Sequence, residues 1–253
     1  MQLDKQGYYG YPEPANDHTM NNMNSMIAPP SPPESAAPFH FALEIAQQPI
    51  RARMCGFGDK DRRQISPPPC VRLRVYDTSG MEVTDISSLD ISMFALSVEL
   101  WSADETTNSS LVQTNGQIHH HHASSIDVTA GPAANSGPTK NLIGTVVATA
   151  YKLYDLQENL GIWFVLHDLS VRTEGEFKLK FSFANLADCF SNEQKSAPVL
   201  CSAFSSPFRS YSAKKFPGVI DSTELSKCFA VQGIKIPIRR ESKTRRPKDE
   251  EQQ

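Results

Sequence analysis

Residues 177–183 alternate strictly between apolar and polar side chains, and this period of two is compatible with one local structure, a β-strand with one buried face. The apolar positions are Phe177, Leu179, Phe181 and Phe183, and the polar positions between them are Lys178, Lys180 and Ser182. Residues 93–101 repeat the pattern with Phe94, Leu96, Val98 and Leu100 on one face. Half-buried strands need a second layer to cover them, so the pattern predicts sheet packed on sheet.

Shorter segments extend this interpretation along the chain. Further strands are predicted over 39–46, 71–75, 142–151 and 162–166. Residues 173–175 predict a hairpin turn and 186–190 a single helical turn, while Pro237 suits an edge or terminal strand within 225–238. Many short strands and few helical periods together predict an all-β sandwich with a few short helices.

Composition divides the chain into a folded part and three segments of other character. Residues 1–37 are rich in Asn, Met, Pro, Tyr and Ser without periodicity, and are expected to be disordered. Residues 113–140 form a predicted disordered insertion. It contains four histidines, 119–122, but no rigid element to support them, so no metal site is expected. The folded domain is expected over 38–240, followed by a charged tail, 241–253.

Several classes of protein do not fit this sequence. No apolar run approaches the ~20 residues of a membrane helix, and the first residues lack the pattern of a secretory signal. The five cysteines are widely spaced and form no C-x-x-C pair, so reduced thiols are expected rather than zinc ligands. Cys55 lies among arginines, where a packing role is expected and a redox role is the alternative.

Enzyme motifs are not found either. The chain contains no G-x-S-x-G, H-E-x-x-H, Walker or dinucleotide-binding pattern. His167 and Asp168 are adjacent, but neighbouring strand residues face opposite ways, which makes them a poor acid–base pair. We therefore expect a non-enzymatic protein without a cofactor, in which His167 has a structural role.

The strongest functional signal is a basic stretch, residues 51–74. It carries seven Lys and Arg against two Asp, in a chain whose net charge is −3, so its basicity is concentrated locally. Gly56 and Gly58 flank Phe57 and predict a tight exposed loop, and the prolines at 67–69 predict a stiff exit from it. Such a braced cationic loop suits the phosphates of duplex DNA, although a solvated basic face paired with acids is the alternative.

Several motifs together identify a family. The run RARMCGFGDKDRR followed by PPPCVRLRV resembles the start of the velvet domain of fungal transcription regulators. The stretches 141–153, 161–183 and 211–239 are similar to later parts of that domain, so the resemblance covers about 39–240. Within the family, the ending KCFAVQGIKIPIR is most similar to the velvet-like B branch.

The resemblance has structural and functional implications. It implies an immunoglobulin-like β-sandwich similar to the Rel homology domain, in which loops at one end hold DNA. It also implies homodimers or heterodimers with other velvet proteins and a complex with a methyltransferase-like regulator. The expected role is control of development, sporulation and secondary metabolism, from the nucleus and the cytoplasm.

Candidate DNA-contacting residues follow from the basic loop and its position in the family motif. The loop is expected to enter the major groove. Its candidates are Arg51, Arg53, Lys60, Arg62, Arg63 and Arg72. Lys214 and Lys215, with Arg209, are expected to contact the DNA backbone from a second loop. The basic residues of 235–248 suit nuclear import or extra phosphate contacts, and a solvated tail is the alternative.

A second function from a different class stays open at this point. The chain could be an interaction subunit of a velvet heterodimer whose partner supplies most of the sequence-specific DNA contact. Its sandwich faces would then form the interface, and its basic loop would only add to the electrostatic field.

Overall fold

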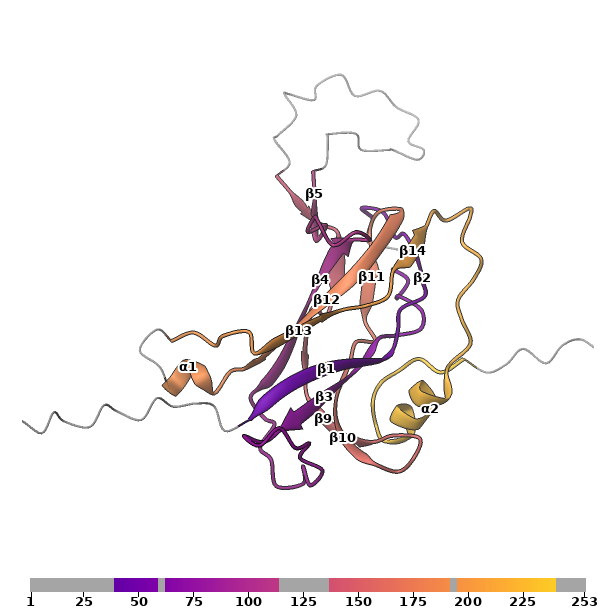
Figure 1. Ribbon diagram of the computed structural model, residues 1–253. Helices are drawn as coiled ribbons and strands as arrows, with labels where there is room; N and C mark the ends of the chain where they lie inside the picture. Colours follow the sequence, from indigo (N-terminus) through magenta and orange to yellow (C-terminus); the bar gives the residue numbers. More distant parts are fainter. Residues whose placement is uncertain (1–38, 59–61, 114–136, 192–194, 240–253) are drawn as a thin grey trace, which may run out of the picture. The chain divides into compact units, whose positions relative to one another are not determined.

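The structure is a computed structural model that describes residues 39–58, 62–113, 137–191 and 195–239 (Figure 1). All of these fall in one compact unit, Ala37–Gln253, and the other unit, Met1–Ala36, lies outside the described residues. The predicted disordered segment 1–37, most of the insertion and the tail 241–253 also lie outside them, as does Lys60.

A four-stranded antiparallel sheet forms the first layer. Its order is β1 (His40–Gln47), β3 (Cys70–Tyr76), β10 (Leu160–Val165) and β9 (Tyr151–Tyr154). Apolar and polar residues alternate along β3, so Val71, Leu73 and Val75 are buried. β10 lies at the centre with every residue from Gly161 to Val165 buried, which confirms the strand predicted from its continuous apolar run.

The second layer is a six-stranded sheet. Its main path is β2 (Arg51–Arg53), β14 (Phe208–Tyr211), β12 (Gly175–Asn185), β4 (Phe94–Ser102) and β8 (Val147–Thr149). The remaining strand, β13 (Cys201–Phe204), pairs with β12. The long antiparallel pair of β12 and β4 brings together the two segments with the clearest alternation in the sequence. β2 and β14 pair in parallel.

The apolar faces of the two sheets meet in one core, which confirms the predicted all-β sandwich. Phe183 of β12 lies near its centre, with its ring centroid 5.0 Å from that of Phe41, 5.2 Å from Phe94 and 6.1 Å from Phe164. Phe41 belongs to the other sheet, as does Phe164, so these contacts join the layers. Burying one such side chain contributes roughly 1.5–3 kcal/mol.

Two short sheets complete the β structure. One pairs β7 (Leu142–Gly144) with β11 (Leu169–Val171), and the other pairs β5 (Leu111–Val112) with β6 (Thr139–Lys140). β6 contains the last two residues of the predicted insertion, so that end of it is ordered by pairing. The predicted hairpin at 173–175 is wrong, because β11 and β12 belong to different sheets.

The helical predictions had mixed outcomes. α1 (Asp188–Ser191) confirms the expected helical turn. The stretch 225–238 instead contains most of α2 (Glu224–Val231), and Pro237 lies outside the strands of the described residues, so the predicted edge or terminal strand is wrong. Thr223 caps the helix by accepting a hydrogen bond from the Ser226 N–H at 3.1 Å. Phe229 packs against Trp163 in a second apolar cluster, with 4.9 Å between the two ring centroids.

Within the described residues, no helix is both long and apolar enough to cross a membrane.

Candidate nucleic-acid interface

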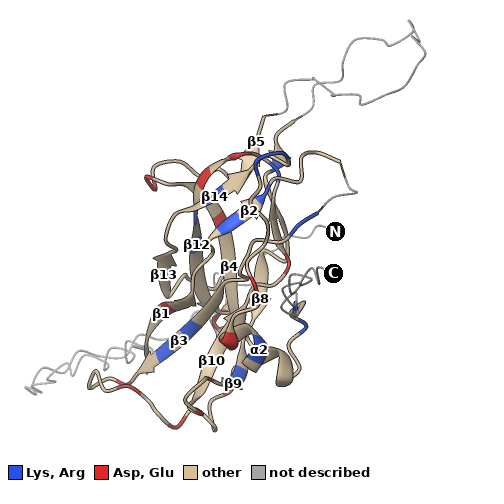
Figure 2. Cartoon of the chain, turned by 90° about the vertical axis from the view of Figure 1, so that its right-hand side faces the viewer, with Lys and Arg blue, Asp and Glu red and all other residues tan. Residues whose placement is uncertain are grey.

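The parallel pairing of β2 with β14 places basic side chains from distant parts of the sequence next to one another. Arg51 lies beside Arg209, and Arg53 beside Tyr211, in the strand register. The residues between them, Ala52 and Ser210, are completely buried. Because alternate strand residues face opposite ways, the basic positions project to the other side. Figure 2 shows this concentration of Lys and Arg on β2 and the loop that follows it.

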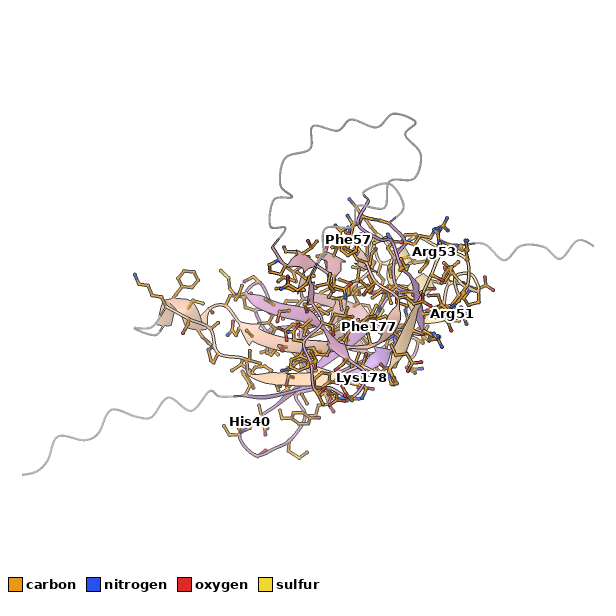
Figure 3. The ribbon with its side chains drawn as sticks, turned by 90° about the horizontal axis from the view of Figure 1, so that it is seen from above. His40, Arg51, Arg53, Phe57, Phe177 and Lys178 are labelled. Carbon is orange, nitrogen blue, oxygen red and sulfur yellow. The ribbon has the colours of Figure 1, made fainter. Side chains whose placement is uncertain are left out.

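The loop after β2 is fixed by backbone hydrogen bonds to two other strands. Met54 donates its N–H to the carbonyl of Tyr211 at 2.8 Å, and Cys55 donates to Val171 at 3.0 Å. Gly56 donates to the Arg172 carbonyl at 3.0 Å and has a φ of +65°, which glycine tolerates best. Phe57 follows at the tip and is 52% exposed. The predicted exposed glycine loop is confirmed. Seen from above in Figure 3, Phe57, Arg51 and Arg53 lie away from His40.

The chain returns from the loop along the edge of β2 that does not pair with β14. Arg51 donates its N–H to the Ser66 carbonyl at 3.0 Å, and Ser66 donates back to the Arg51 carbonyl at 2.8 Å. β2 is therefore paired on one side by β14 and bridged on the other by Ser66. Pro67 and Pro69 are buried next to this bridge, which agrees with the predicted stiff exit.

Arg62 lies on the outward side of this exit, against the β7–β11 sheet. Its Nη2 is 3.6 Å from Oδ1 of Asp168, and both side chains are 42% exposed. Gly144, with a φ of +108°, allows β7 to approach closely here, because a Cβ at this position would collide with the Asp168 carbonyl. Asp168 is thus an ion-pair partner of the basic loop. From the sequence alone, Asp168 was considered only as an acid–base partner of the adjacent His167.

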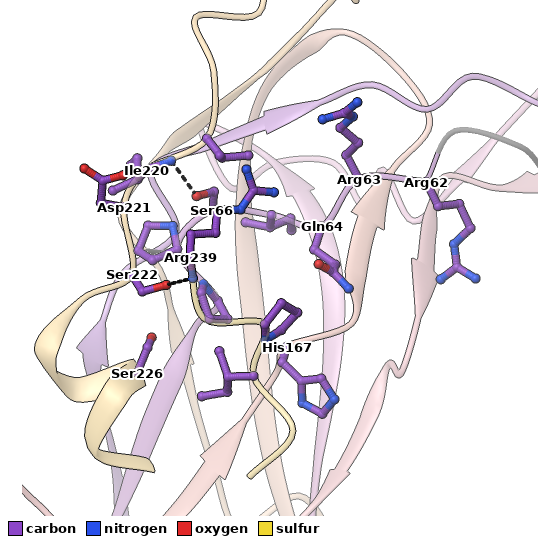
Figure 4. Close-up of a pocket in the computed structure, with 16 residues that line it drawn as sticks. Arg62, Arg63, Gln64, Ser66, His167, Ile220, Asp221, Ser222, Ser226 and Arg239 are labelled. Atoms are coloured by element: carbon purple, nitrogen blue, oxygen red, sulfur yellow. Dashed lines mark hydrogen bonds between the residues drawn. The ribbon is translucent and has the colours of Figure 1, made fainter. Parts of the chain in front are cut away.

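A cavity of about 300 Å³ lies between the loop exit and the C-terminal segment (Figure 4). Arg62, Arg63, His167 and Arg239 contribute to its wall, with Asp221. The backbone N–H of Ile220 donates to Ser66 Oγ at 3.0 Å, and the N–H of Arg239 donates to Ser222 Oγ at 2.9 Å. The first bond holds the C-terminal segment against the loop exit, and the second joins two parts of that segment to each other. The buried Nδ1 of His167 has no hydrogen-bond partner among the described residues.

The second predicted loop lies beyond β14. Lys214 and Lys215 are exposed, and Lys215 Nζ is 3.8 Å from Oε1 of Glu174. Arg209 Nη1 is likewise 3.8 Å from Oε1 of Glu176, and its guanidinium lies over the Tyr211 ring at 5.3 Å. Continuity from β2 through β14 therefore connects the two predicted basic groups along one edge of the sheet.

Arg72 does not belong with this group. It lies on β3, with Nη1 3.7 Å from Oδ2 of Asp155, whose side chain is only 9% exposed. Its guanidinium carbon is 5.7 Å from the centroid of Trp163. A half-buried arginine with an acid and an aromatic partner is explained by packing. Its alternation with Val71 and Leu73 was the sequence signal for this role.

Arg172 was missed by the sequence analysis. Its Nη1 donates to the carbonyl of Gly56 at 2.9 Å, and its guanidinium carbon is 5.7 Å from the Phe57 ring centroid. It follows β11 directly, at the point where the loop after β2 crosses. No local pattern around Arg172 indicates this contact, because its partners are distant in the sequence.

Comparison with known proteins agrees with the motifs. The sequence profile described as Velvet factor matches residues 41–243. A velvet complex subunit from Emericella nidulans is 39% identical, over 86% of this chain and 85% of that protein. The corresponding velvet complex subunit from Aspergillus flavus is 38% identical, over 79% and 78%. Velvet complex subunit 2 of Gibberella moniliformis is 37% identical, over 92% of this chain and 69% of that protein.

Proposed function

The chain belongs to the velvet family, and on this premise we propose that it is a DNA-binding transcription regulator. It acts as part of velvet dimers or complexes, in the nucleus and the cytoplasm, and controls fungal development, sporulation and secondary metabolism. The observation that carries the proposal is the parallel β2–β14 pair, which sets Arg51 beside Arg209 and continues to Lys214 and Lys215.

The electrostatics of this edge support a polyanionic ligand. Duplex DNA carries one negative charge per ~1.7 Å of its axis, so a row of cations can contact several phosphates at once. Arginine can also donate two parallel hydrogen bonds to guanine in the major groove. The protein's own acids compete only weakly, since the pairs of Arg62, Arg209 and Lys215 span 3.6–3.8 Å between exposed groups.

The anchoring of the loop supports specific rather than diffuse binding. Backbone bonds from Met54, Cys55 and Gly56 fix the loop to two strands, so little chain entropy is lost when it meets DNA. Exposed lysines on an unanchored segment would bind phosphates without fixing the register of the protein on the duplex.

The test compares two double variants of the full chain that remove the same charge. Arg51→Gln with Arg53→Gln alters the proposed interface, whereas Lys140→Gln with Lys195→Gln removes two exposed lysines outside it. Affinity for duplex DNA is measured over a series of salt concentrations. We expect the arginine variant to flatten the slope of log affinity against log salt by about 1.8, from ~0.9 per phosphate contact, and the lysine variant to leave it nearly unchanged. Equal effects of the two variants would contradict the assignment.

A second candidate function rests on the names of the relatives, which are subunits of velvet complexes. By this alternative the chain associates with another velvet protein, and with a methyltransferase-like regulator, while the velvet partner supplies most of the sequence-specific contact. The chain alone would then bind DNA without sequence preference, and preference would arise only after the partner is added. A direct DNA-binding regulator shows preference by itself against scrambled duplexes.

A further inference from the structure

The aromatic side chain at the tip of the basic loop belongs to neither apolar cluster of the described residues. Phe57 is 52% exposed, and it stands between two glycines. A Cβ added at Gly56 or Gly58 would meet nothing within 4 Å, so the tip projects into open space. A large apolar ring held in the open on a cationic edge costs hydration free energy in the unbound protein.

Arg172 holds this ring from one side. Its Nη1 donates to the carbonyl of Gly56 at 2.9 Å, while the N–H of Gly56 donates to the Arg172 carbonyl at 3.0 Å. The guanidinium carbon lies 5.7 Å from the ring centroid, within the range of a cation–π contact. The tip is therefore fixed by the backbone and side chain of one residue, and the rest of the ring stays accessible.

The arginines of β2 lie on the same loop. Arg53 is four positions before Phe57, and Met54 and Gly56 between them are tied to Tyr211 and Arg172. Any duplex that engages the Arg51 and Arg53 side chains thus meets an apolar ring whose position is fixed relative to them. In the major groove, the apolar group that a ring can recognise is the C5-methyl group of thymine.

We propose that Phe57 is a specificity-determining residue that contacts a thymine methyl group in the major groove, and that Arg172 is the positioning residue that holds it there. This proposal rests on the DNA-binding function proposed above. It adds a contact that charge alone cannot provide, since phosphates are the same at every base pair and methyl groups are not.

The experiment begins with the full chain and a pool of random duplexes, from which the preferred sequence is selected. Each thymine of that sequence is then replaced in turn by deoxyuridine, which removes only the methyl group. We expect the wild-type chain to lose about fourfold in affinity at one thymine, from the ~0.8 kcal/mol of one buried methyl. Phe57→Ala should bind the unmodified duplex more weakly and show no further loss at that deoxyuridine. Its salt slope should stay unchanged, because no phosphate contact is removed.

Two further variants distinguish loss of the contact between Phe57 and the methyl group from a general folding defect. Phe57→Leu keeps an apolar side chain and should retain part of the methyl preference. Arg172→Met keeps an unbranched side chain but removes the two guanidinium contacts to the loop tip, and should reduce the methyl preference with the salt slope preserved. Thermal unfolding of each variant identifies any that fails to fold. A folding defect alone would weaken all duplexes alike and leave the fourfold methyl effect intact.

The outcomes distinguish this inference from the function beneath it. If the wild-type chain selects a sequence but Phe57→Ala retains every thymine preference, the contact is wrong and the DNA-binding function stands. If the wild-type chain selects no sequence, both are wrong for the isolated chain. If Phe57→Ala loses affinity at a base step regardless of methylation, the ring stacks on or inserts between bases, and the methyl contact is overturned.

Discussion

The acidic turns and the basic edge use their charges in different ways. The basic edge comprises the described residues Arg51, Arg53, Arg62, Arg209, Lys214 and Lys215. In the turns, Asp77, Asp85, Asp90 and Asp104 each accept hydrogen bonds from residues two positions away on their own segment. Asp77, for example, accepts from the N–H of Ser79 at 2.8 Å and from that of Met81 at 3.0 Å. At the basic edge the ion pairs of Arg62, Arg209 and Lys215 span 3.6–3.8 Å and link exposed groups of different segments.

The difference separates charges that shape the backbone from charges that remain available to a ligand. Asx turns hold a local conformation, so their carboxylates are already committed. Arg74 shows that a cation can also be engaged within the protein. Its Nη2 is 2.6 Å from Oε2 of Glu44, and its Nη1 is 2.8 Å from Oε1 of Glu82. The number of basic residues is therefore a poor guide to the binding site. On β3, Arg74 differs from the basic edge by its short ion pairs, and Arg72 differs by the burial of its partner Asp155.

The largest effect is expected at the basic loop. Neutralising Lys60, Arg62 and Arg63 together by Gln should lower DNA affinity on the order of 100-fold at 0.15 M salt, if each contacts one phosphate. The unfolding free energy should change by less than about 1 kcal/mol, because the Arg62–Asp168 pair is exposed. Fluorescence anisotropy and urea denaturation measure the two quantities. Unchanged affinity would remove this loop from the interface.

Arg74→Gln should give the opposite pattern. It removes two short ion pairs, to Glu44 and Glu82, and should lower the unfolding free energy by about 1 kcal/mol. DNA affinity should fall much less than in the loop variant, since Arg74 lies on β3 with Arg72. A DNA defect as large as that of the loop variant would show that short ion pairs do not mark committed charges. Urea denaturation checks the first expectation, and anisotropy checks the second.

Asp168→Asn should increase the affinity for DNA. Removing the carboxylate 3.6 Å from Arg62 Nη2 leaves that guanidinium with one competitor fewer for phosphate. We expect a two- to fourfold increase in affinity at low salt, which disappears at high salt because exposed charges are screened. Weaker binding would show instead that Asp168 is needed to orient Arg62.

The smallest effect concerns the acidic turns and requires low pH. Hydrogen bonds from Ser79 lower the pKa of Asp77 below 3.8, and Ser87 does the same for Asp85. Since the unfolded chain then binds protons before the folded one, stability should rise with pH through the region just below pH 4 and level off above it. Asp77→Asn should flatten this dependence slightly, with no effect on DNA affinity at pH 7. Thermal melts from pH 2.5 to 5 test it, and an unaltered pH profile would contradict it.

Strand alternation made much of the fold predictable. Residues 93–101 and 177–183 predicted β4 and β12 because burial on one face forces a period of two. The helix α2 was missed because it is only eight residues long, so its apolar face behind the Thr223 cap repeats just once, from Leu225 to Phe229. The turn at 173–175 looked like a hairpin because local sequence does not reveal that β11 and β12 belong to different sheets.

The site was predictable in composition but not in arrangement. Local charge density identified Arg51, Arg53, Lys214 and Lys215 without showing that β2 and β14 pair. It also included Arg72, whose side chain packs against Asp155 and Trp163. Arg172 could not be found from sequence, because its contacts to Gly56 and Phe57 depend on the crossing of two distant segments.

The strand that carries Arg51 and Arg53 is three residues long and occupied along both edges, by β14 and by Ser66. A strand enclosed in this way can exchange its outward side chains without changing its backbone path. It can therefore carry different side chains at fixed positions. Laboratory selection for altered affinity for DNA should find its solutions at positions 51, 53 and 209, and leave the lengths of the surrounding segments as they are.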